Sequence, residues 1–254
     1  MILEWLKAAL LEVQEYTKLC IAVARATVSR PFYARDVIEQ FDAIGLGSLT
    51  VVILTGMFTG AVLALQSGFT LDQFGARTAV GRLVSASMVK ELGPVLTALM
   101  VTGRVGSGIA AELGSMMVTD QINALRALGT DPVRKLVVPR VLAGILMAPV
   151  LTVIADFVGI VGGWIVARFQ LQVASGVYWS SVTYGLYTQD LWMGLIKPFV
   201  LGFAIVTIAC HVGLRTSGGT QGVGEATTVA VVAGSVAVIA ADFFVTQVLI
   251  VLLY

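Results

Sequence analysis

One long uncharged segment limits the folds that this chain can adopt. Residues 43–71 contain no Asp, Glu, Lys or Arg. A helix needs about 20 apolar residues to cross a hydrocarbon core of about 30 Å, so this segment can span a membrane with some tilt. Gly56 and Gly60 within it form a GxxxG pair, which permits a close helix contact but also arises by chance. The segment predicts a membrane protein.

The composition of the whole chain supports the same class. Of the 254 residues, 57% are hydrophobic and 12% are charged, whereas a soluble domain carries about 25% charged residues. The net charge of +1 does not indicate a nucleic-acid-binding protein. Cys20 and Cys210 lack the spacing of a metal or redox site, and His211 is the single histidine. We therefore expect inert thiols, a structural histidine and no metal site.

Further apolar segments bring the number of expected membrane crossings to five. The predicted spans cover residues 43–71, 83–102, 141–167, 191–212 and 229–254. The predicted fold class is an all-α membrane protein with an N-terminal interfacial helix, five transmembrane helices and a short cytoplasmic helix. Residues 1–42 contain the N-terminal helix and its approach to the membrane, and residues 43–254 form one five-span domain. Residues 168–190, rich in interfacial aromatic residues, and residues 213–228, rich in glycine, are expected to be loops.

The N-terminal segment has a different pattern from the spans. Apolar residues in 1–30 recur at helical spacing, with charged residues such as Lys7, Glu12 and Lys18 between them. This pattern predicts a helix that lies in the membrane interface. The alternative is a cytosolic helix that packs on the bundle. Because the segment has no continuous apolar core, we do not expect a cleavable signal.

The basic residues predict the orientation in the membrane. Eleven Lys and Arg residues fall on the side of the N-terminus, residues 103–140 and residues 213–228, and three (Arg77, Arg82 and Arg168) fall on the other side. The positive-inside rule places the first group in the cytoplasm. Tyr254 then lies on the opposite side.

Residues 91–140 are more elaborate than an ordinary connection between spans. They lead through a face of small residues into a helix at about residues 112–128, which stops at Gly129. A basic cluster of Arg134, Lys135 and Arg140 then precedes the third span. A short cytoplasmic helix between two spans is similar to the coupling helix of ABC transporter membrane subunits, which inserts into a groove of the ATPase. The alternative is an amphipathic helix that rests on the membrane.

Ionisable residues inside the predicted spans are candidates for function. They are Lys90, Glu91, Asp156, Lys197 and Asp242. Such residues are costly in a membrane and normally face a partner or a cavity. They can form a structural ion-pair network, or they can line a substrate path as a charge switch, and the sequence leaves both alternatives open.

Motifs for catalysis are absent from the sequence. Nothing matches GxxxxGK[ST], and the glycine-rich residues 218–225 lack the lysine of a phosphate-binding loop. HExxH and GxSxG are also absent. We therefore predict a non-catalytic subunit, driven by an ion gradient or by a separate ATPase.

Several segments together resemble one family. Residues 91–140 are similar to the signature region of the MlaE/YrbE family, the permeases of MCE-associated ABC lipid transporters. GAVLALQ at residues 60–66, GVGEATTVAVV at residues 222–232 and AADFFVTQ at residues 240–247 resemble further family segments. The resemblance covers nearly the whole chain from about Phe41 onward.

This resemblance implies a partner set and a location. The family members form homodimers, bind a cytoplasmic ABC ATPase that uses ATP and Mg²⁺, and sit beneath a hexameric MCE-domain protein. In some systems a STAS-domain protein is also present. The chain itself would hold no cofactor and would bind phospholipid as substrate. The expected location is the bacterial inner (cytoplasmic) membrane, with the N-terminus in the cytoplasm and the C-terminus in the periplasm.

The resemblance also implies three groups of site residues. The first is a lipid pocket at the dimer interface, lined by Leu63, Gln66, Thr70, Leu71 and Phe74. The second is a buried polar network of Lys90, Glu91, Lys197 and Asp242. The third is the ATPase-coupling group, carried over as Glu112, Asp120, Leu125, Arg126 and Leu128. Lys90 stands where relatives carry arginine, which replaces a bidentate donor with a point charge.

The expected function is therefore ATP-driven phospholipid movement between an inner membrane and periplasmic MCE proteins. An ion-coupled secondary transporter that uses Glu91, Asp156 or Asp242 as proton carriers is the alternative, although the sequence has no visible inverted repeat. A third class is a passive scaffold, which predicts no bound lipid.

Overall fold

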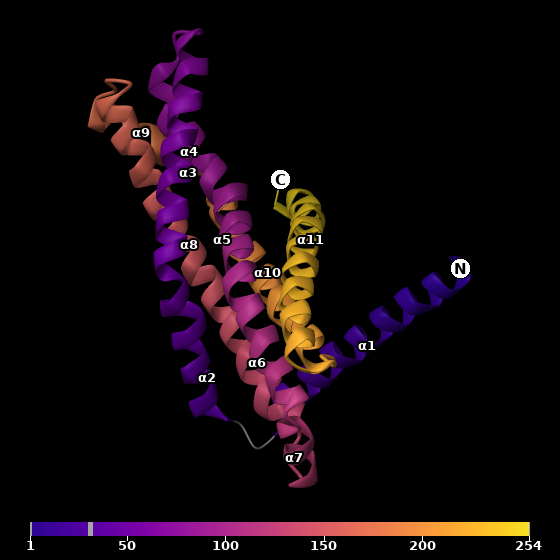
Figure 1. Cartoon of the computed structure of the whole chain (residues 1–254). Helices are drawn as coiled ribbons and strands as arrows, with labels where there is room; N and C mark the ends of the chain where they lie inside the picture. Colours follow the sequence, from indigo (N-terminus) through magenta and orange to yellow (C-terminus); the bar gives the residue numbers. More distant parts are fainter. Residues whose placement is uncertain (1, 30–32, 254) are drawn as a thin grey trace. The chain divides into compact units, whose positions relative to one another are not determined.

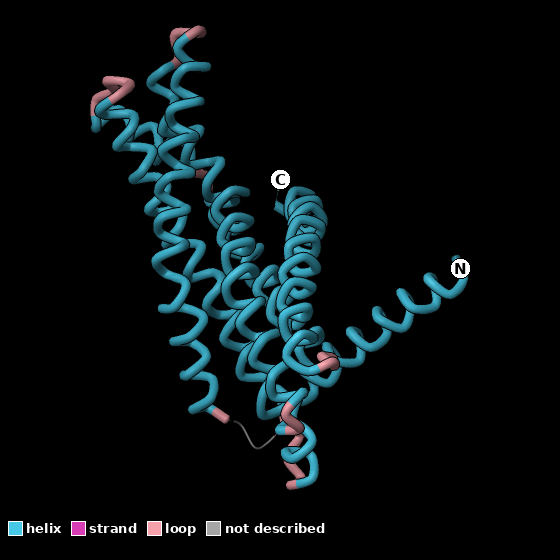
Figure 2. Tube along the Cα trace, in the orientation of Figure 1, coloured by secondary structure: helices cyan, strands magenta, loops and turns pink. Residues whose placement is uncertain are grey.

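The structure is a computed structural model that describes residues 2–29 and 33–253. Almost all of this part of the chain is helical, and it contains no strand (Figures 1 and 2). Figure 2 shows that the loops are short and lie at the ends of helices. The predicted all-α class is confirmed.

The helix bounds are as follows. The α-helices are α1 (Ile2–Val28), α2 (Ala34–Phe41), α3 (Gly47–Asp72), α4 (Val80–Ser87), α5 (Gly93–Val101), α6 (Ser107–Val118), α7 (Gln121–Ala127), α8 (Val138–Phe169), α9 (Ser175–Gly185), α10 (Thr188–Leu214) and α11 (Gly219–Leu253). Short π-helical segments join some of them without a break: η1 (Asp42–Leu46), η3 (Met88–Leu92), η4 (Thr102–Gly106) and η5 (Val133–Val137). A 3₁₀ turn, η2 (Arg77–Ala79), precedes α4.

The described part of the chain contains five helical segments that are long and apolar enough to cross a membrane. They are Ala34–Asp72, Arg77–Val118, Val133–Phe169, Thr188–Leu214 and Gly219–Leu253. The prediction of five transmembrane helices is confirmed. Each helical segment extends beyond its predicted apolar stretch at one or both ends.

Two predicted loops and one predicted unbroken helix differ from the sequence-based expectation. The 168–190 loop contains α9, whose Tyr178 is fully buried and donates a hydrogen bond to the carbonyl of Ile160 at 2.9 Å. The 213–228 loop is reduced to residues 215–218, because α10 and α11 extend into it. The expected helix at 112–128 is divided into α6 and α7 by Thr119 and Asp120. Asp120 has a left-handed φ of 58°, which no helix interior accommodates.

The chain forms two compact units. Unit 1 comprises Met1–Ile44, Thr102–Gly144 and Phe203–Ala237, and unit 2 comprises Gly45–Val101, Ile145–Gly202 and Val238–Tyr254. The chain passes between the units within continuous helical segments, including α8, α10 and α11.

Unit 2 is built on a close contact between α3 and α8, which run beside each other in Figure 1. A Cβ atom at Gly60 would meet the carbonyl oxygen of Gly159, and one at Gly162 would meet the carbonyl oxygen of Met57. Gly56 likewise faces the backbone of Ala155. The predicted GxxxG pair therefore does bring two helices into backbone contact. Beside it lies the apolar core of the unit, formed by Ala64, Val80, Val84, Met88, Val89, Ile160, Ala167, Leu171, Val173, Tyr178 and Val182.

Unit 1 ties α1 to α10 through polar side chains. The hydroxyls of Tyr16 and Thr207 are 2.8 Å apart, and the Tyr16 ring meets the His211 ring edge to face. Burial raises the pKa of Tyr16 to about 12, so this hydroxyl stays neutral. Glu12 pairs with His211 at 3.2 Å and with Arg215 at 2.9 Å. His211 thus has the structural surroundings expected for it, and α1 leaves apolar residues such as Leu10 exposed.

Candidate functional site

The polar residues predicted inside the spans meet around Lys197. Its Nζ lies 2.5 Å from Oε2 of Glu91 and 3.3 Å from Oδ1 of Asp242. Lys197 itself is fully buried, whereas Glu91 and Asp242 are partly accessible. One ammonium group therefore neutralises carboxylates from two other helical segments. We call Lys197, Glu91 and Asp242 the lysine cluster.

A proline contributes to the geometry of the lysine cluster. Lys197 also donates a hydrogen bond to the backbone carbonyl of Lys90 at 2.8 Å. In an α-helix that carbonyl would accept from the N–H four residues later, but that residue is Pro94, which has no N–H. The segment is π-helical at η3, a distortion that is frequent at functional sites. The local sequence therefore frees one carbonyl lone pair for the lysine.

Lys90 joins the neighbourhood through a residue that the sequence analysis did not select. Its Nζ lies 2.7 Å from Oδ1 of Asp190, which is fully buried at the start of α10. Asp190 also accepts a hydrogen bond from the backbone N–H of Tyr187 at 3.1 Å. Asp190 was assigned to a loop in the sequence analysis, so its burial beside a membrane lysine was missed. A charge-balance argument would have found it, since Lys90 required an acidic partner.

The five residues predicted for a lipid pocket divide into two sets on α3 and the turn after it. Leu63 and Leu71 pack partly against the core of unit 2. Gln66, Thr70 and Phe74 are exposed; the spacing of four residues places Gln66 and Thr70 on one face of α3, and Phe74 lies in the turn that follows. The Thr70 hydroxyl donates to the carbonyl of Gln66 at 3.1 Å. The exposed set is free to contact lipid or another chain, and its role remains a prediction.

The coupling residues lie on or beside α7. Asp120 precedes the helix and accepts a hydrogen bond from the Asn123 side chain at 2.8 Å. Arg126 and Leu128 are exposed, Leu128 to 79%, and Leu125 is half-buried. Ile122, which the sequence analysis did not single out, is fully buried and anchors α7 within unit 1. The helix therefore offers one apolar and one charged side chain outward.

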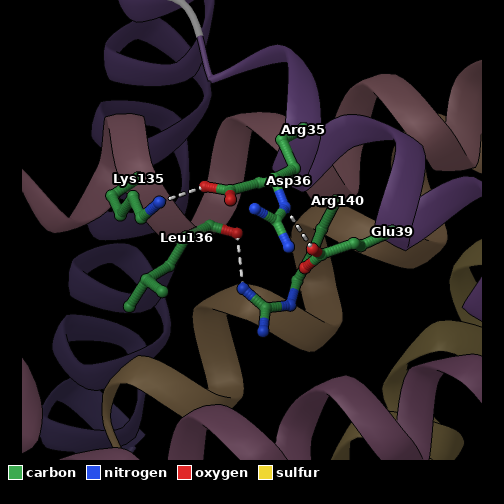
Figure 3. A network of polar contacts seen from close by, with 6 residues as sticks. All are labelled: Arg35, Asp36, Glu39, Lys135, Leu136 and Arg140. Carbon is green, nitrogen blue, oxygen red and sulfur yellow. Dashed lines mark hydrogen bonds and ion pairs between the residues drawn. The ribbon is translucent and has the colours of Figure 1, made fainter.

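Glu112 has a partner inside the chain. Its Oε1 lies 2.7 Å from Nη2 of Arg140, a side chain that is only 4% exposed. Arg140 also donates to the carbonyl of Leu136 at 2.6 Å (Figure 3). The pair joins α6, which leads to α7, to the start of α8, which follows it. Glu112 therefore braces the base of this segment, whatever else it contacts.

A second set of contacts stabilises the same region beside the start of α8. Lys135 lies 2.5 Å from Oδ2 of Asp36 on α2 and 4.4 Å from the centre of the Tyr33 ring. Figure 3 shows this pair beside the exposed ion pair of Arg35 and Glu39 on α2. Two residues of the predicted basic cluster, Lys135 and Arg140, thus serve internal contacts.

The two ends of the Glu112–Arg140 pair are expected to respond unequally to substitution. Glu112→Ala should lower the free energy of unfolding by about 1–3 kcal/mol, because it leaves a buried guanidinium without its carboxylate. Arg140→Met should cost less, since Glu112 can be hydrated. Glu39→Ala, in an exposed pair, is the matched control and should cost about 0.5 kcal/mol or less. Denaturant unfolding in detergent measures all three; equal costs for Glu112→Ala and Glu39→Ala would contradict the bracing role.

Metal binding finds no support in the described residues, where no group of three or more His, Cys, Asp or Glu side chains could hold an ion. Asp156 is not one of the carboxylates that pair with Lys197, and its Oδ1 faces the position of Gly93. The arrangement as a whole is a buried charge cluster in unit 2 and a braced, outward-facing short helix in unit 1.

Comparison with known proteins agrees with these features. The family described as "Permease MlaE" matches residues 37–248. The chain is 41% identical over 235 residues to a "Probable ABC transporter permease protein" of Rickettsia felis, which covers 92% of this chain and 91% of that protein. It is 37% identical over 213 residues to the "Intermembrane phospholipid transport system permease protein MlaE" of Haemophilus influenzae, which covers 84% and 82%. The resemblance seen in the motifs is confirmed, and the chain belongs to the MlaE family of ABC transporter permeases.

Proposed function

We propose that this chain is the membrane subunit of an ATP-driven transporter that moves phospholipids between the inner membrane and periplasmic MCE proteins. The observation that carries the proposal is the 37% identity to the Haemophilus influenzae protein named as an intermembrane phospholipid transport permease. The match covers 84% of this chain, and the family match over residues 37–248 includes α3, the lysine cluster and α7. The chain is non-catalytic in this proposal, and a partner ATPase binds and hydrolyses ATP with Mg²⁺.

The coupling step is assigned to α7. Leu125, Arg126 and Leu128 would insert into a groove of the ATPase, and the braces at Glu112 and Lys135 would pass its closure to the spans. The support is the combination of a buried anchor, Ile122, with exposed side chains on the same short helix. Asp120 would keep the left-handed break that separates α7 from α6.

The substrate is assigned to the outward-facing end of α3. In a homodimer, Gln66, Thr70 and Phe74 would line a phospholipid pocket together with Leu63 and Leu71. The support is the exposure of Gln66 and Thr70 on one face of α3 and of Phe74 in the turn after it. A hexameric MCE-domain protein on the periplasmic side would receive or deliver the lipid, and a STAS-domain protein is a possible further subunit on the ATPase. The N-terminus would be cytoplasmic and α1 interfacial, as its exposed apolar residues favour.

The coupling assignment predicts loss of the ATPase on substitution in α7. Leu125→Asp and Arg126→Glu should each reduce co-purification of the ATPase on the order of tenfold, because they remove an apolar and a charged anchor from a small interface. The measurement is affinity purification from the native membrane with quantitative mass spectrometry. Lys18→Glu on α1 is the control for charge reversal and should leave the complex intact, since Lys18 is exposed and its ion pair within the described part of the chain is with Glu15 on the same helix.

Two results would overturn the proposal. Variants of α7 that still co-purify with a fully active ATPase would remove the coupling assignment. Phospholipid transport in proteoliposomes that contain this chain without an ATPase, driven by a pH gradient, would support the ion-coupled alternative.

A further inference from the structure

Asp156 is a buried carboxyl group that the proposed function does not use. It lies on α8 within unit 2 and is 8% exposed. Its Oδ1 is buried and has no hydrogen-bond partner. The space for this oxygen comes from Gly93, where any Cβ atom would collide with it. One oxygen of this acidic group therefore lies unsatisfied against Gly93 in the interior of unit 2, while the group as a whole keeps a small exposed fraction.

The cations inside the spans do not compensate Asp156. Lys197 pairs with Glu91 and Asp242, and Lys90 pairs with Asp190. An isolated carboxyl group in an apolar medium is costly, and such residues in membrane helices normally have a partner or a ligand. A partner for Asp156 must therefore come from outside the described residues.

A cavity of about 340 Å³ lies beside Asp156 in unit 2. Apart from this carboxyl group, its lining is apolar and includes Ile160 and Leu186. Phe157 and Leu191 also line it and are 65% and 51% exposed, so the cavity opens toward the surroundings of the spans. In a membrane those surroundings are acyl chains. An apolar ligand could therefore enter sideways from the lipid.

We propose that this cavity binds an amphiphile whose alkyl chain ends in a protonated amine, with the ammonium group against Asp156. Charge complementarity determines the head of the ligand, because the cavity offers one uncompensated carboxyl group. The apolar lining determines the tail. The volume falls near the lower limit for ligand pockets, so it fits a compact head and part of a chain rather than a whole phospholipid. The site is distinct from the lipid pocket proposed on α3.

The test uses the purified full chain in a non-ionic detergent and a photoreactive dodecylamine. Crosslinks are mapped to peptides of α8 and α10 by mass spectrometry, with unlabelled competitors. Dodecylamine should compete on the order of tenfold better than dodecanol, since a hydrogen bond to a charged group is stronger than one to a neutral group. Asp156→Asn should reduce dodecylamine to the level of dodecanol. Equal competition by the two compounds in the wild type, or an unchanged preference in Asp156→Asn, would overturn the site.

A second variant keeps the test decisive if Asp156→Asn fails to fold. Leu195→Trp places a larger side chain in the lining of the cavity while Asp156 itself is unchanged, and it should abolish labelling. Leu146→Trp is the matched control, because Leu146 is likewise exposed but lies on α8 outside the cavity lining. This variant should retain labelling. Labelling that persists in Leu195→Trp would count against the site.

A separate competition experiment identifies the natural source of the amine. Competition by lysophosphatidylethanolamine would identify a phospholipid headgroup as the ammonium donor, and competition by dodecylamine alone would identify a single-chain amine. Binding is measured without an ATPase, so failure of this site leaves the proposed transport function untouched, and loss of coupling through α7 leaves this site untouched.

Discussion

Replacement of Lys197 with methionine is expected to destabilise the chain by about 3–5 kcal/mol and to abolish transport. The substitution keeps the length and apolar stem of the side chain but removes the cation that pairs with Glu91 and Asp242 among the described residues. Leaving carboxylates inside the spans without their partner is costly, most of all for Asp242, which is the less exposed of the two. Thermal unfolding in detergent and lipid transport in reconstituted complexes measure the two effects.

Two further variants separate stability from function. Lys90→Met leaves the fully buried carboxylate of Asp190 without its lysine, so it should also be strongly destabilising. The triple variant Lys197→Met, Glu91→Gln, Asp242→Asn has no net charge in the cluster and should recover much of the stability. If the triple variant also transports lipid, the cluster is a structural network. If it is stable and inactive, the cluster takes part in transport. A Lys197→Met protein as stable as the wild type would contradict both interpretations.

Gly60→Leu is expected to destabilise unit 2 by more than about 3 kcal/mol. Its side chain would have to occupy the position of the Gly159 carbonyl group, which is backbone and cannot change rotamer. Overpacking against side chains costs about 1–3 kcal/mol, and a collision with backbone exceeds that range because two helices must separate. Gly60→Ala already places its Cβ atom on that carbonyl oxygen, so it should cost about 3 kcal/mol, at the upper end of the overpacking range. The measurement is the denaturant midpoint of the purified chain.

A glycine with open space around it provides the control for this series. A Cβ atom at Gly176 on α9 meets nothing within 4 Å, so Gly176→Ala should be neutral or slightly stabilising. Equal effects of alanine at Gly60 and Gly176 would show that α3 and α8 are not in the close contact described.

The sequence predicted the features that depend on composition along one helix. The five spans follow from apolar length, and the backbone contact of α3 follows from Gly56 and Gly60. The break between α6 and α7 could not be predicted, because Thr119 and Asp120 are compatible with a helix and the left-handed φ of Asp120 is set by the surrounding fold.

The predicted sites show the same difference between what one helix specifies and what the surrounding fold specifies. Lys197, Glu91 and Asp242 were selected because charges are rare in spans, and the structure brings them together. Asp190, the partner of Lys90, and Arg140, the partner of Glu112, lie near span ends, where charged residues are common, so their rarity gives no signal and only the search for a counter-charge could have found these pairs. The lipid-pocket and coupling residues rest on family resemblance, since a pocket completed by another subunit leaves no pattern in one chain.

The contact of α3 with α8 restricts how unit 2 can change its shape. Gly60 against Gly159 and Gly162 against Met57 involve main-chain atoms, which have no alternative rotamers. The helices α3 and α8 therefore have a single way to pack, and they should move as one rigid body during a transport cycle. Lys197, in contrast, bears a long side chain with several torsions and three donors. Conformational freedom in this unit should therefore be concentrated where α10 meets its neighbours through lysine, and slow exchange should be observed there rather than at the glycine contact.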